Sequence, residues 1–138
     1  MTLGAAVLLL SAAPPALAST TAHGCTVAPT RPALSNGNTL VRYTATASCK
    51  AGRYLQVEQT FYERDGSQYT YLGQQVWTSE VKAAEKFSHF TDQPIPDTEP
   101  GDEELYQTVR FRVMPFGGDW SKWTSREFSA RLTVPQPQ

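Results

Sequence analysis

Apolar and polar residues alternate along much of this chain, and a period of two predicts β-strands that bury one face and expose the other. Residues 39–49 show the pattern most clearly. Their apolar face consists of Val41, Tyr43, Ala45, Ala47 and Cys49. Residues 105–113 repeat the pattern, with Arg110 and Arg112 on the polar face and Leu105 on the apolar one. Both stretches are therefore expected to be strands that line a core.

A long hairpin is predicted for residues 53–64 and 67–78, because the Asp65-Gly66 pair between them is a two-residue turn signal. Counting outward from that turn gathers the aliphatic residues on one face, which we expect to be the core. These residues are Leu55, Val57, Phe61, Leu72 and Val76. The opposite face is then expected to be exposed. Its aromatic residues are Tyr54, Tyr62, Tyr69, Tyr71 and Trp77.

The remaining segments complete an all-β domain. Residues 86–91 predict a short strand, residues 92–104 an acidic, proline-rich loop, and residues 126–134 a closing strand. The inward residues of the closing strand are expected to be Phe128, Ala130, Leu132 and Val134. With about seven strands, turns between them and no helix, the chain predicts an antiparallel two-sheet sandwich.

The two cysteines are placed to meet. When residues 25–34 and 39–49 are folded about Gly37, Cys25 lies opposite Cys49 on the neighbouring strand. In an exported protein this predicts a disulfide, which in the chain-entropy model contributes about 3 to 4 kcal/mol of stability. A redox or metal role is less favoured because the chain has no Cys-x-x-Cys. Lipid modification of Cys25 is a further alternative, which would leave Cys49 unpaired.

The N-terminal residues are typical of a secretory signal. Residues 3–13 are almost wholly apolar, and Ala16-Leu17-Ala18 supplies the small residues of a cleavage site after residue 18. The apolar run is short for a membrane span. The lack of a preceding Lys or Arg suggests a start codon further upstream; the alternative is a buried helix, which Pro14-Pro15 would end. We expect a signal over residues 1–18, a flexible lead-in over 19–24 and a secreted sandwich domain over 25–135.

Two tryptophans follow the arginine strand after a break of two glycines. Trp120 and Trp123 are three positions apart. A guanidinium group is attracted to the face of an indole ring. We therefore expect Arg110 and Arg112 to interleave with Trp120 and Trp123 in a cation–π ladder.

This part of the chain resembles the fibronectin type III fold, in the variant found in haematopoietic cytokine receptors. There an Arg-x-Arg strand is followed by Trp-Ser-x-Trp-Ser; the matching residues here are Arg110-Phe111-Arg112, Trp120-Ser121-Lys122-Trp123 and Thr124. The likeness covers roughly residues 105–134. It implies a fibronectin III-like or immunoglobulin-like sandwich whose arginine strand lies beside residues 53–64, so that both arginines join the aromatic face. It implies the fold and not a receptor function.

The residues that carry catalysis are sparse. The chain has no Gly-x-Ser-x-Gly and no phosphate-binding glycine loop, and its two histidines are His23 and His89. Four acids of the proline-rich loop offer oxygens to calcium at spacings that match no standard site: Asp92, Asp97, Glu99 and Asp102. A formal charge of −1 gives no general reason to bind nucleic acid. We therefore expect no enzyme, no cofactor and no bound metal.

The aromatic face is the clearest functional candidate. Tyrosine and tryptophan rings with polar neighbours bind sugar rings or a protein partner, although the same rings also serve as a stabilising layer under arginine stems. We expect a secreted, monomeric, non-catalytic interaction module that binds an unidentified protein or glycan. The alternatives are a carbohydrate-binding module, or an inhibitor of a secreted hydrolase that presents residues 94–100 or 116–119.

Overall fold

The computed structural model describes residues 18–96 and 101–135, and the secondary structure of these residues consists of strands. The prediction of an all-β, two-sheet antiparallel fold is confirmed, with ten strands in the described residues rather than about seven. The predicted signal, apart from Ala18 at its end, lies outside the described residues.

The first sheet is built around β4, which pairs with other strands on both of its edges. Its strands are β1 (Thr20–Ala22), β2 (Cys25–Pro29), β3 (Ala33–Ser35), β4 (Leu40–Cys49) and β7 (Glu85–Pro94). One edge of β4 pairs with β2 and then β3, the other edge pairs with β7, and β1 extends the sheet beyond β2. The alternating burial along β4 follows the alternating sequence that predicted it.

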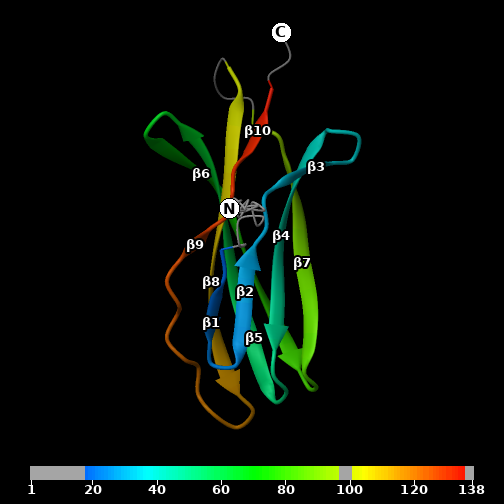
Figure 1. The fold of residues 1–138 in the computed structure, drawn as a ribbon, viewed down its shortest axis with the longest axis vertical. Coiled ribbons are helices and arrows are strands. Elements are labelled where there is room, and N and C mark those ends of the chain that lie inside the picture. Colours follow the sequence, from blue (N-terminus) through cyan, green and yellow to red (C-terminus); the bar gives the residue numbers. More distant parts are fainter. Residues whose placement is uncertain (1–17, 97–100, 136–138) are drawn as a thin grey trace, which may run out of the picture.

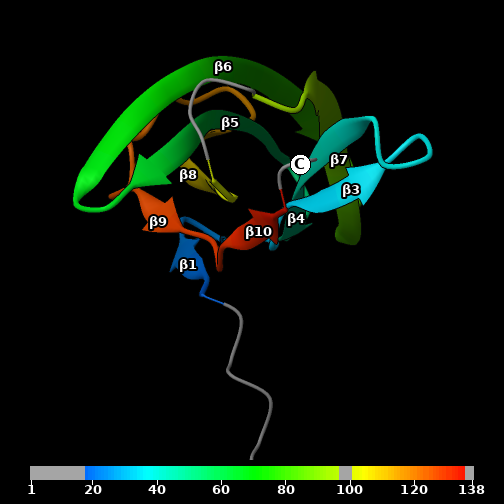
Figure 2. The ribbon, with the colours of Figure 1, turned by 90° about the horizontal axis from the view of Figure 1, so that it is seen from above.

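The second sheet is longer and carries the candidate site. Its strands are β5 (Arg53–Asp65), β6 (Gln68–Val81), β8 (Glu103–Pro115), β9 (Glu127–Phe128) and β10 (Leu132–Val134). Their order is β6, β5 and β8, with β9 and β10 both on the far edge of β8. The arginine strand thus lies beside β5. The sheets run along the long axis of the molecule (Figure 1), and β6 is the outermost ribbon of its sheet when the molecule is seen from above (Figure 2).

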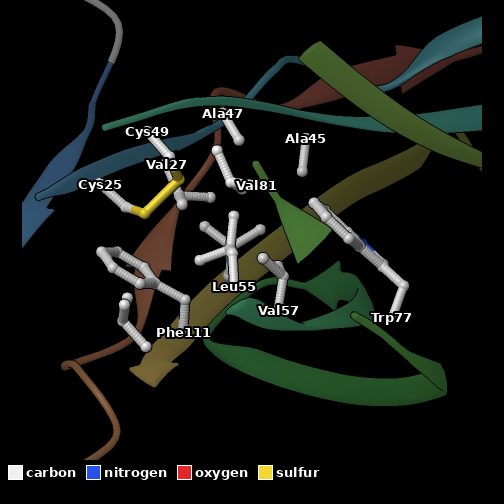
Figure 3. Close-up of a cluster of buried hydrophobic side chains, with 12 residues drawn as sticks. Cys25, Val27, Ala45, Ala47, Cys49, Leu55, Val57, Trp77, Val81 and Phe111 are labelled. Carbon is white, nitrogen blue, oxygen red and sulfur yellow. A yellow bond between two sulfur atoms is a disulfide. The ribbon is translucent and has the colours of Figure 1, made fainter. Parts of the chain in front are cut away.

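Side chains from both sheets fill the space between them. The larger cluster of buried residues includes Leu55 and Phe111 of the second sheet and the disulfide-bonded Cys25 and Cys49 of the first (Figure 3). The predicted disulfide is therefore confirmed, and it is part of the core rather than an external clasp. A smaller cluster lies further along the strands, and it consists of Val41, Tyr43, Phe61, Leu105 and Val134.

Two buried glutamines lie on the inward face between these clusters. Gln59 follows Val57 of the larger cluster along β5, and Gln107 precedes Val109 along β8; both glutamines are 0% exposed. The Gln59 amide nitrogen lies 3.0 Å from the side-chain oxygen of Gln107. Buried polar groups need hydrogen-bond partners within the protein, because they have lost the bonds that they would make to water. The core is therefore two apolar clusters joined by a hydrogen-bonded amide pair.

The turn of the long hairpin lies one residue later than predicted. Asp65 pairs with Gln68, so the two loop residues are Gly66 and Ser67. Gly66 has a φ of 60°, whereas Ser67 is not among the residues with positive φ, as in a type II′ turn with glycine first. This slip moves every cross-strand partner by two positions, which leaves the tyrosines near the turn on the face that was predicted.

A β-bulge then reverses the two faces of β6. Phe61 pairs with Gly73, but the preceding pair along the ladder is Tyr62 with Tyr71. Leu72 is therefore an extra residue on β6. One extra residue shifts the alternation of side chains by one position, so every residue beyond the bulge changes face.

The bulge corrects one predicted site residue. Trp77 was expected on the exposed face, but it points into the core and is only 8% exposed. Val76, which was expected in the core, is 46% exposed. The Trp77 ring lies 6.2 Å from the ring of Phe87 and 4.9 Å from that of His89, both on β7. Trp77 is therefore a core residue and not part of a binding face.

The closing strand also differs from its prediction. It is split into β9 and β10, and only its end is buried as expected, at Val134 with Leu132 partly buried beside it. Phe128 and Ala130 are exposed instead. The reason is that Ser129, between them, takes the inward position and bonds its backbone N–H to the Gln107 carbonyl at 2.9 Å.

Candidate binding surface

The outer face of the second sheet brings together the four residues of the expected ladder. The Arg112 guanidinium lies 4.7 Å from the ring centre of Trp120 and 4.9 Å from that of Trp123. The Arg110 guanidinium lies 4.8 Å from the Trp123 ring centre, so that Trp123 contacts both arginines. The order along the face is therefore Trp120, Arg112, Trp123 and Arg110, with charges and rings in alternation.

The segment that carries the tryptophans is fixed to β8 by hydroxyl residues. Ser121 donates its N–H to the Val113 carbonyl at 2.8 Å and accepts the Val113 N–H on Oγ at 3.0 Å. Thr124 makes the same pair of bonds with Phe111, at 2.9 and 3.0 Å, and Ser129 repeats them further along the strand. A hydroxyl at these positions completes a ladder that the backbone alone would leave half made.

Polar partners within the domain hold the two arginines. Arg110 forms an ion pair of 2.8 Å with Glu58, which is 5% exposed, and Arg126 contacts the same carboxylate at 3.1 Å. Arg112 donates from Nε to the Gln56 side-chain oxygen at 2.7 Å. The middle of the outer face is therefore a packed layer of stacked and paired groups rather than an open surface.

An exposed group of rings lies at the other end of the same face, near the tip of the β5–β6 hairpin. We call it the aromatic patch; its members are Tyr62, Tyr69, Tyr71, Tyr106 and Phe128. Their ring centres are 6.0 to 6.4 Å apart, and Tyr69 touches three of the other four. Tyr71 is 59%, Phe128 49% and Tyr69 48% exposed. Four strands, β5, β6, β8 and β9, thus contribute to one apolar surface.

The sequence identified three members of the patch and missed two. Tyr106 has the same alternation as Arg110 and Arg112 along β8, and this signal was sufficient to place it on the outer face. Phe128 was assigned inward because the closing strand was read as regular. Tyr54, by contrast, lies apart from the patch, and its ring packs at 5.1 Å against Phe116 beyond the opposite end of β8.

Charged residues border the patch. Arg64 lies 5.6 Å over the Tyr69 ring, and hydrogen bonding to Tyr106 raises the pKa of its guanidinium. Arg131 forms an ion pair of 3.3 Å with Glu104. Both arginines line a shallow hollow, the other residues of which are Asp65, Gly66, Asp102 and Glu104. An apolar centre with a mixed-charge rim is the composition of a protein–protein interface.

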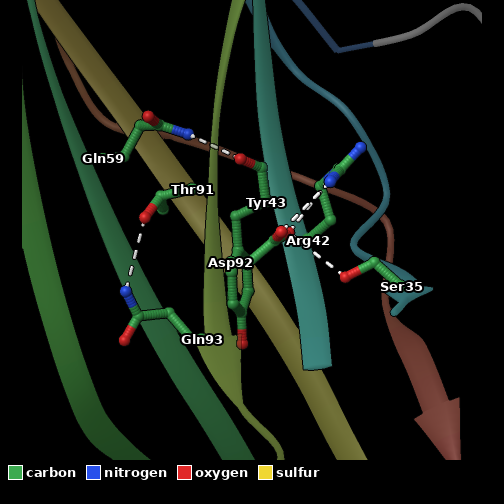
Figure 4. A network of polar contacts seen from close by, with 7 residues as sticks. All are labelled: Ser35, Arg42, Tyr43, Gln59, Thr91, Asp92 and Gln93. Carbon is green, nitrogen blue, oxygen red and sulfur yellow. Dashed lines mark hydrogen bonds and ion pairs between the residues drawn. The ribbon is translucent and has the colours of Figure 1, made fainter. Parts of the chain in front are cut away.

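A second exposed ring lies on the outer face of the first sheet. Phe90 is 51% exposed, and the Arg42 guanidinium lies 3.9 Å from its ring centre. Arg42 also pairs with Asp92 at 2.9 Å, and Ser35 bonds the same carboxylate at 3.2 Å (Figure 4). The hydrogen bond from Arg42 lowers the pKa of Asp92. Phe90 is thus a single exposed ring, covered by an arginine that is itself paired with Asp92. It provides a comparison for the aromatic patch.

Neither a group of metal-ligating side chains nor a membrane-spanning helix is found in the described part of the chain. Within it, no three or more His, Cys, Asp or Glu side chains form a group that could hold a metal ion. It likewise contains no helix with the length and apolar character to cross a membrane. Asp97 and Glu99 of the acidic loop lie outside the described residues.

Comparison with known proteins adds no assignment: no protein-family model matches the chain, and no curated protein matches it. The resemblance to cytokine-receptor fibronectin domains therefore stays a prediction from the sequence. The geometry of the aromatic patch is the observation from which a function can be argued.

Proposed function

We propose that this protein is an exported, non-catalytic interaction module that binds a protein partner through the aromatic patch. The observation that carries the proposal is the contiguity of the exposed rings around Tyr69. A single exposed ring is common on protein surfaces, but a group of large apolar side chains in contact is a feature of interaction sites. Tyrosine is also enriched among residues that dominate binding energy.

The angles between the rings favour a protein over a flat polysaccharide. The Tyr62 ring is inclined at 82° to Tyr69 and 75° to Tyr71, and the Tyr69 ring at 65° to Tyr106. Rings at these angles cannot all lie parallel to one sugar chain. An uneven apolar surface with a charged rim suits the side chains of a protein, which interdigitate with it.

Export is supported by the disulfide. Cys25 and Cys49 are bonded within the core, at 1% and 4% exposure. Structural disulfides form and persist in oxidising compartments outside the cytosol. The N-terminal signal predicted from the sequence is a separate argument for the same location.

Two variants of the patch and one matched control test the proposal. Tyr71→Ala and Tyr69→Ala remove exposed rings of the patch, and Phe90→Ala removes an equally exposed ring on the other sheet. Proteins captured from culture supernatant by the immobilised wild-type chain would be identified, and the affinity of each purified candidate measured by titration calorimetry. We expect each patch variant to lose about 2 kcal/mol or more of binding free energy, and the control to keep wild-type affinity.

Urea unfolding of each variant separates a binding defect from a folding defect, because exposed rings contribute little to stability. Equal affinity of all four proteins for the captured partner would refute the proposal. Binding of the wild-type chain to a glycan array, lost in Tyr71→Ala, would assign the patch to carbohydrate instead.

A further inference from the structure

The free edge of β6 differs from the other free edges in the described part of the chain. Its residues 68–79 include twelve consecutive positions without a charged residue, a histidine or a proline. By contrast, β7 carries Glu85, Lys86, His89, Asp92 and Pro94 along its length. The strands β1, β3, β9 and β10 have two or three residues each.

Natural sheets protect long edges, because unpaired backbone N–H and C=O groups form a template for another strand. Charged side chains, prolines, β-bulges and very short strands are the usual protection, and each of the other described edges has a charge, a proline or a very short strand. The bulge of β6 lies at Leu72, at one end of residues 73–81, and leaves these residues in regular pairing with β5. The regular portion of β6, which we define as residues 73–81 beyond the bulge, has a charge only at Glu80. An edge left open over this length is therefore suited to pairing.

We propose that the regular portion of β6 pairs antiparallel with the same strand of a second copy of this chain, which gives a two-fold symmetric dimer. In an isologous contact the same surface must fit itself. In an antiparallel strand pair, residues directly opposite share the same face of the sheet. Self-pairing of β6 therefore always matches outward residues with outward residues and core-facing residues with core-facing residues.

The register of the pair follows from the length of the regular portion. All nine residues find partners only if the two-fold axis passes through its midpoint, which is Trp77. Val76 then lies opposite Thr78 of the second copy, and Gln74 opposite its Glu80. Both outward pairs are compatible, and the one charged residue faces an amide rather than its own copy. Like charges directly opposite each other would destabilise the pair, and this register avoids them.

The dimer would change how the aromatic patch binds its partner, an effect that rests on the proposed function. A two-fold axis perpendicular to the sheet leaves the outer faces of both copies on the same side. The two aromatic patches would then lie at opposite ends of one continuous sheet and face the same way. A partner present in several copies on a surface would be held by both patches, with an avidity that exceeds the single affinity.

Two substitutions of opposite charge at one exposed position test both the dimer and its register. Gln74 is exposed on the outward face of β6. In the proposed register Gln74→Glu places a carboxylate opposite Glu80 of the second copy, twice in each dimer. Gln74→Lys places an ammonium group opposite the same residue. Sedimentation velocity of the full, disulfide-bonded chain over a concentration series would give the dimer dissociation constant of each protein.

We expect the wild-type chain to dimerise reversibly, with a dissociation constant raised about threefold to tenfold by Gln74→Glu and lowered by a similar factor by Gln74→Lys. A wild-type chain that stays monomeric throughout would overturn the proposal. A shift of both dissociation constants in the same direction would also overturn it, because a charge that only hinders pairing at the edge acts in the same way whatever its sign. The aromatic patch is untouched by either substitution, so a failure here leaves the proposed function standing.

Discussion

The indole Nε1 of Trp77 donates a hydrogen bond of 2.9 Å to the side-chain oxygen of Gln59, and both residues are buried between the sheets. The Gln59 amide nitrogen lies 3.0 Å from the Gln107 side-chain oxygen. It also lies 3.4 Å from the Tyr43 carbonyl, as Figure 4 shows. Gln107 in turn donates to the carbonyls of Thr30 and Thr44, at 2.8 and 2.7 Å. A single chain of hydrogen bonds therefore crosses the core from β6 to the first sheet.

Replacement of Gln59 by leucine should be strongly destabilising despite the conservation of volume. The Trp77 N–H and the Gln107 side-chain oxygen would lose their partner in a dry interior, and each buried orphan costs about 1 to 3 kcal/mol. We expect Gln59→Leu to lower the free energy of unfolding by about 2 to 5 kcal/mol, measured by urea denaturation.

The double variant Gln59→Leu/Trp77→Phe provides the control for that result. Trp77→Phe removes the N–H that Gln59→Leu leaves unpaired, so the two losses should sum to more than the loss in the double variant. Strict additivity would mean that the 2.9 Å bond contributes nothing to stability.

The disulfide predicts a second stability effect. It closes a loop with a sequence separation of 24 residues, for which the chain-entropy model gives about 3.5 kcal/mol. The free energy of unfolding of Cys25→Ala/Cys49→Ala, measured by urea denaturation, should therefore be lower by that amount or more, since the sulfurs are also core atoms. Because both residues are buried, dithiothreitol should reduce the native protein only as fast as it opens. Rapid reduction of the disulfide in the absence of urea, measured by titration of the free thiols, would contradict this.

The cation–π ladder predicts that one arginine carries more packing than its neighbour. Arg112 lies against two tryptophan rings, whereas Arg110 lies against one. Arg112→Met keeps an unbranched side chain over the rings and removes the charge; with about 0.5 to 1 kcal/mol for each exposed contact, we expect a loss of about 1 to 2 kcal/mol. Arg112→Lys should restore part of it. A variant as stable as the wild type would show that the alternating order of rings and charges is not stabilising.

The sequence predicted the features that depend on alternation within one strand, and missed those that depend on a change of phase. The buried face of β4 and the pairing of Cys25 with Cys49 follow from uninterrupted alternation and a single turn. The misplacement of Trp77 has one cause, the extra residue at Leu72. The local signal of the bulge was Gly73, which follows the extra residue and has a φ of 155°. An isolated glycine inside a strand pattern indicates a bulge, but it does not define which residue is the extra one.

The aromatic patch shows the same limit. Tyr62, Tyr69 and Tyr71 were found because the slip at the turn preserved their face. Phe128 was missed because Ser129 takes the inward position, and the bond that holds it there joins segments more than twenty residues apart. Local pattern thus defined the faces of the strands, whereas contacts between distant segments decided where each regular stretch was interrupted.

The stack of His89 on Trp77 predicts a pH-dependent stability. The two rings lie 4.9 Å apart at an angle of 29°, and Gln75 Nε2 is 3.2 Å from His89 Nε2, where the amide can donate to an unprotonated nitrogen. Burial lowers the pKa of His89 from its ordinary 6.5. The unfolded chain therefore takes up this proton first as the pH falls, and stability should decrease from about pH 7 until the pH passes the folded-state pKa.

His89→Phe keeps a ring over Trp77 and cannot bind a proton, so the fall in stability over that range should be smaller in this variant. Urea midpoints measured at intervals from pH 7 to about pH 5 would isolate the effect, because carboxylates titrate mainly near pH 4. Below the folded-state pKa both states of the wild-type chain carry the proton, and the difference from the variant should become constant. Parallel midpoint curves for the wild type and His89→Phe throughout the range would show that His89 titrates alike in both states, and that its contact with Trp77 is indifferent to charge.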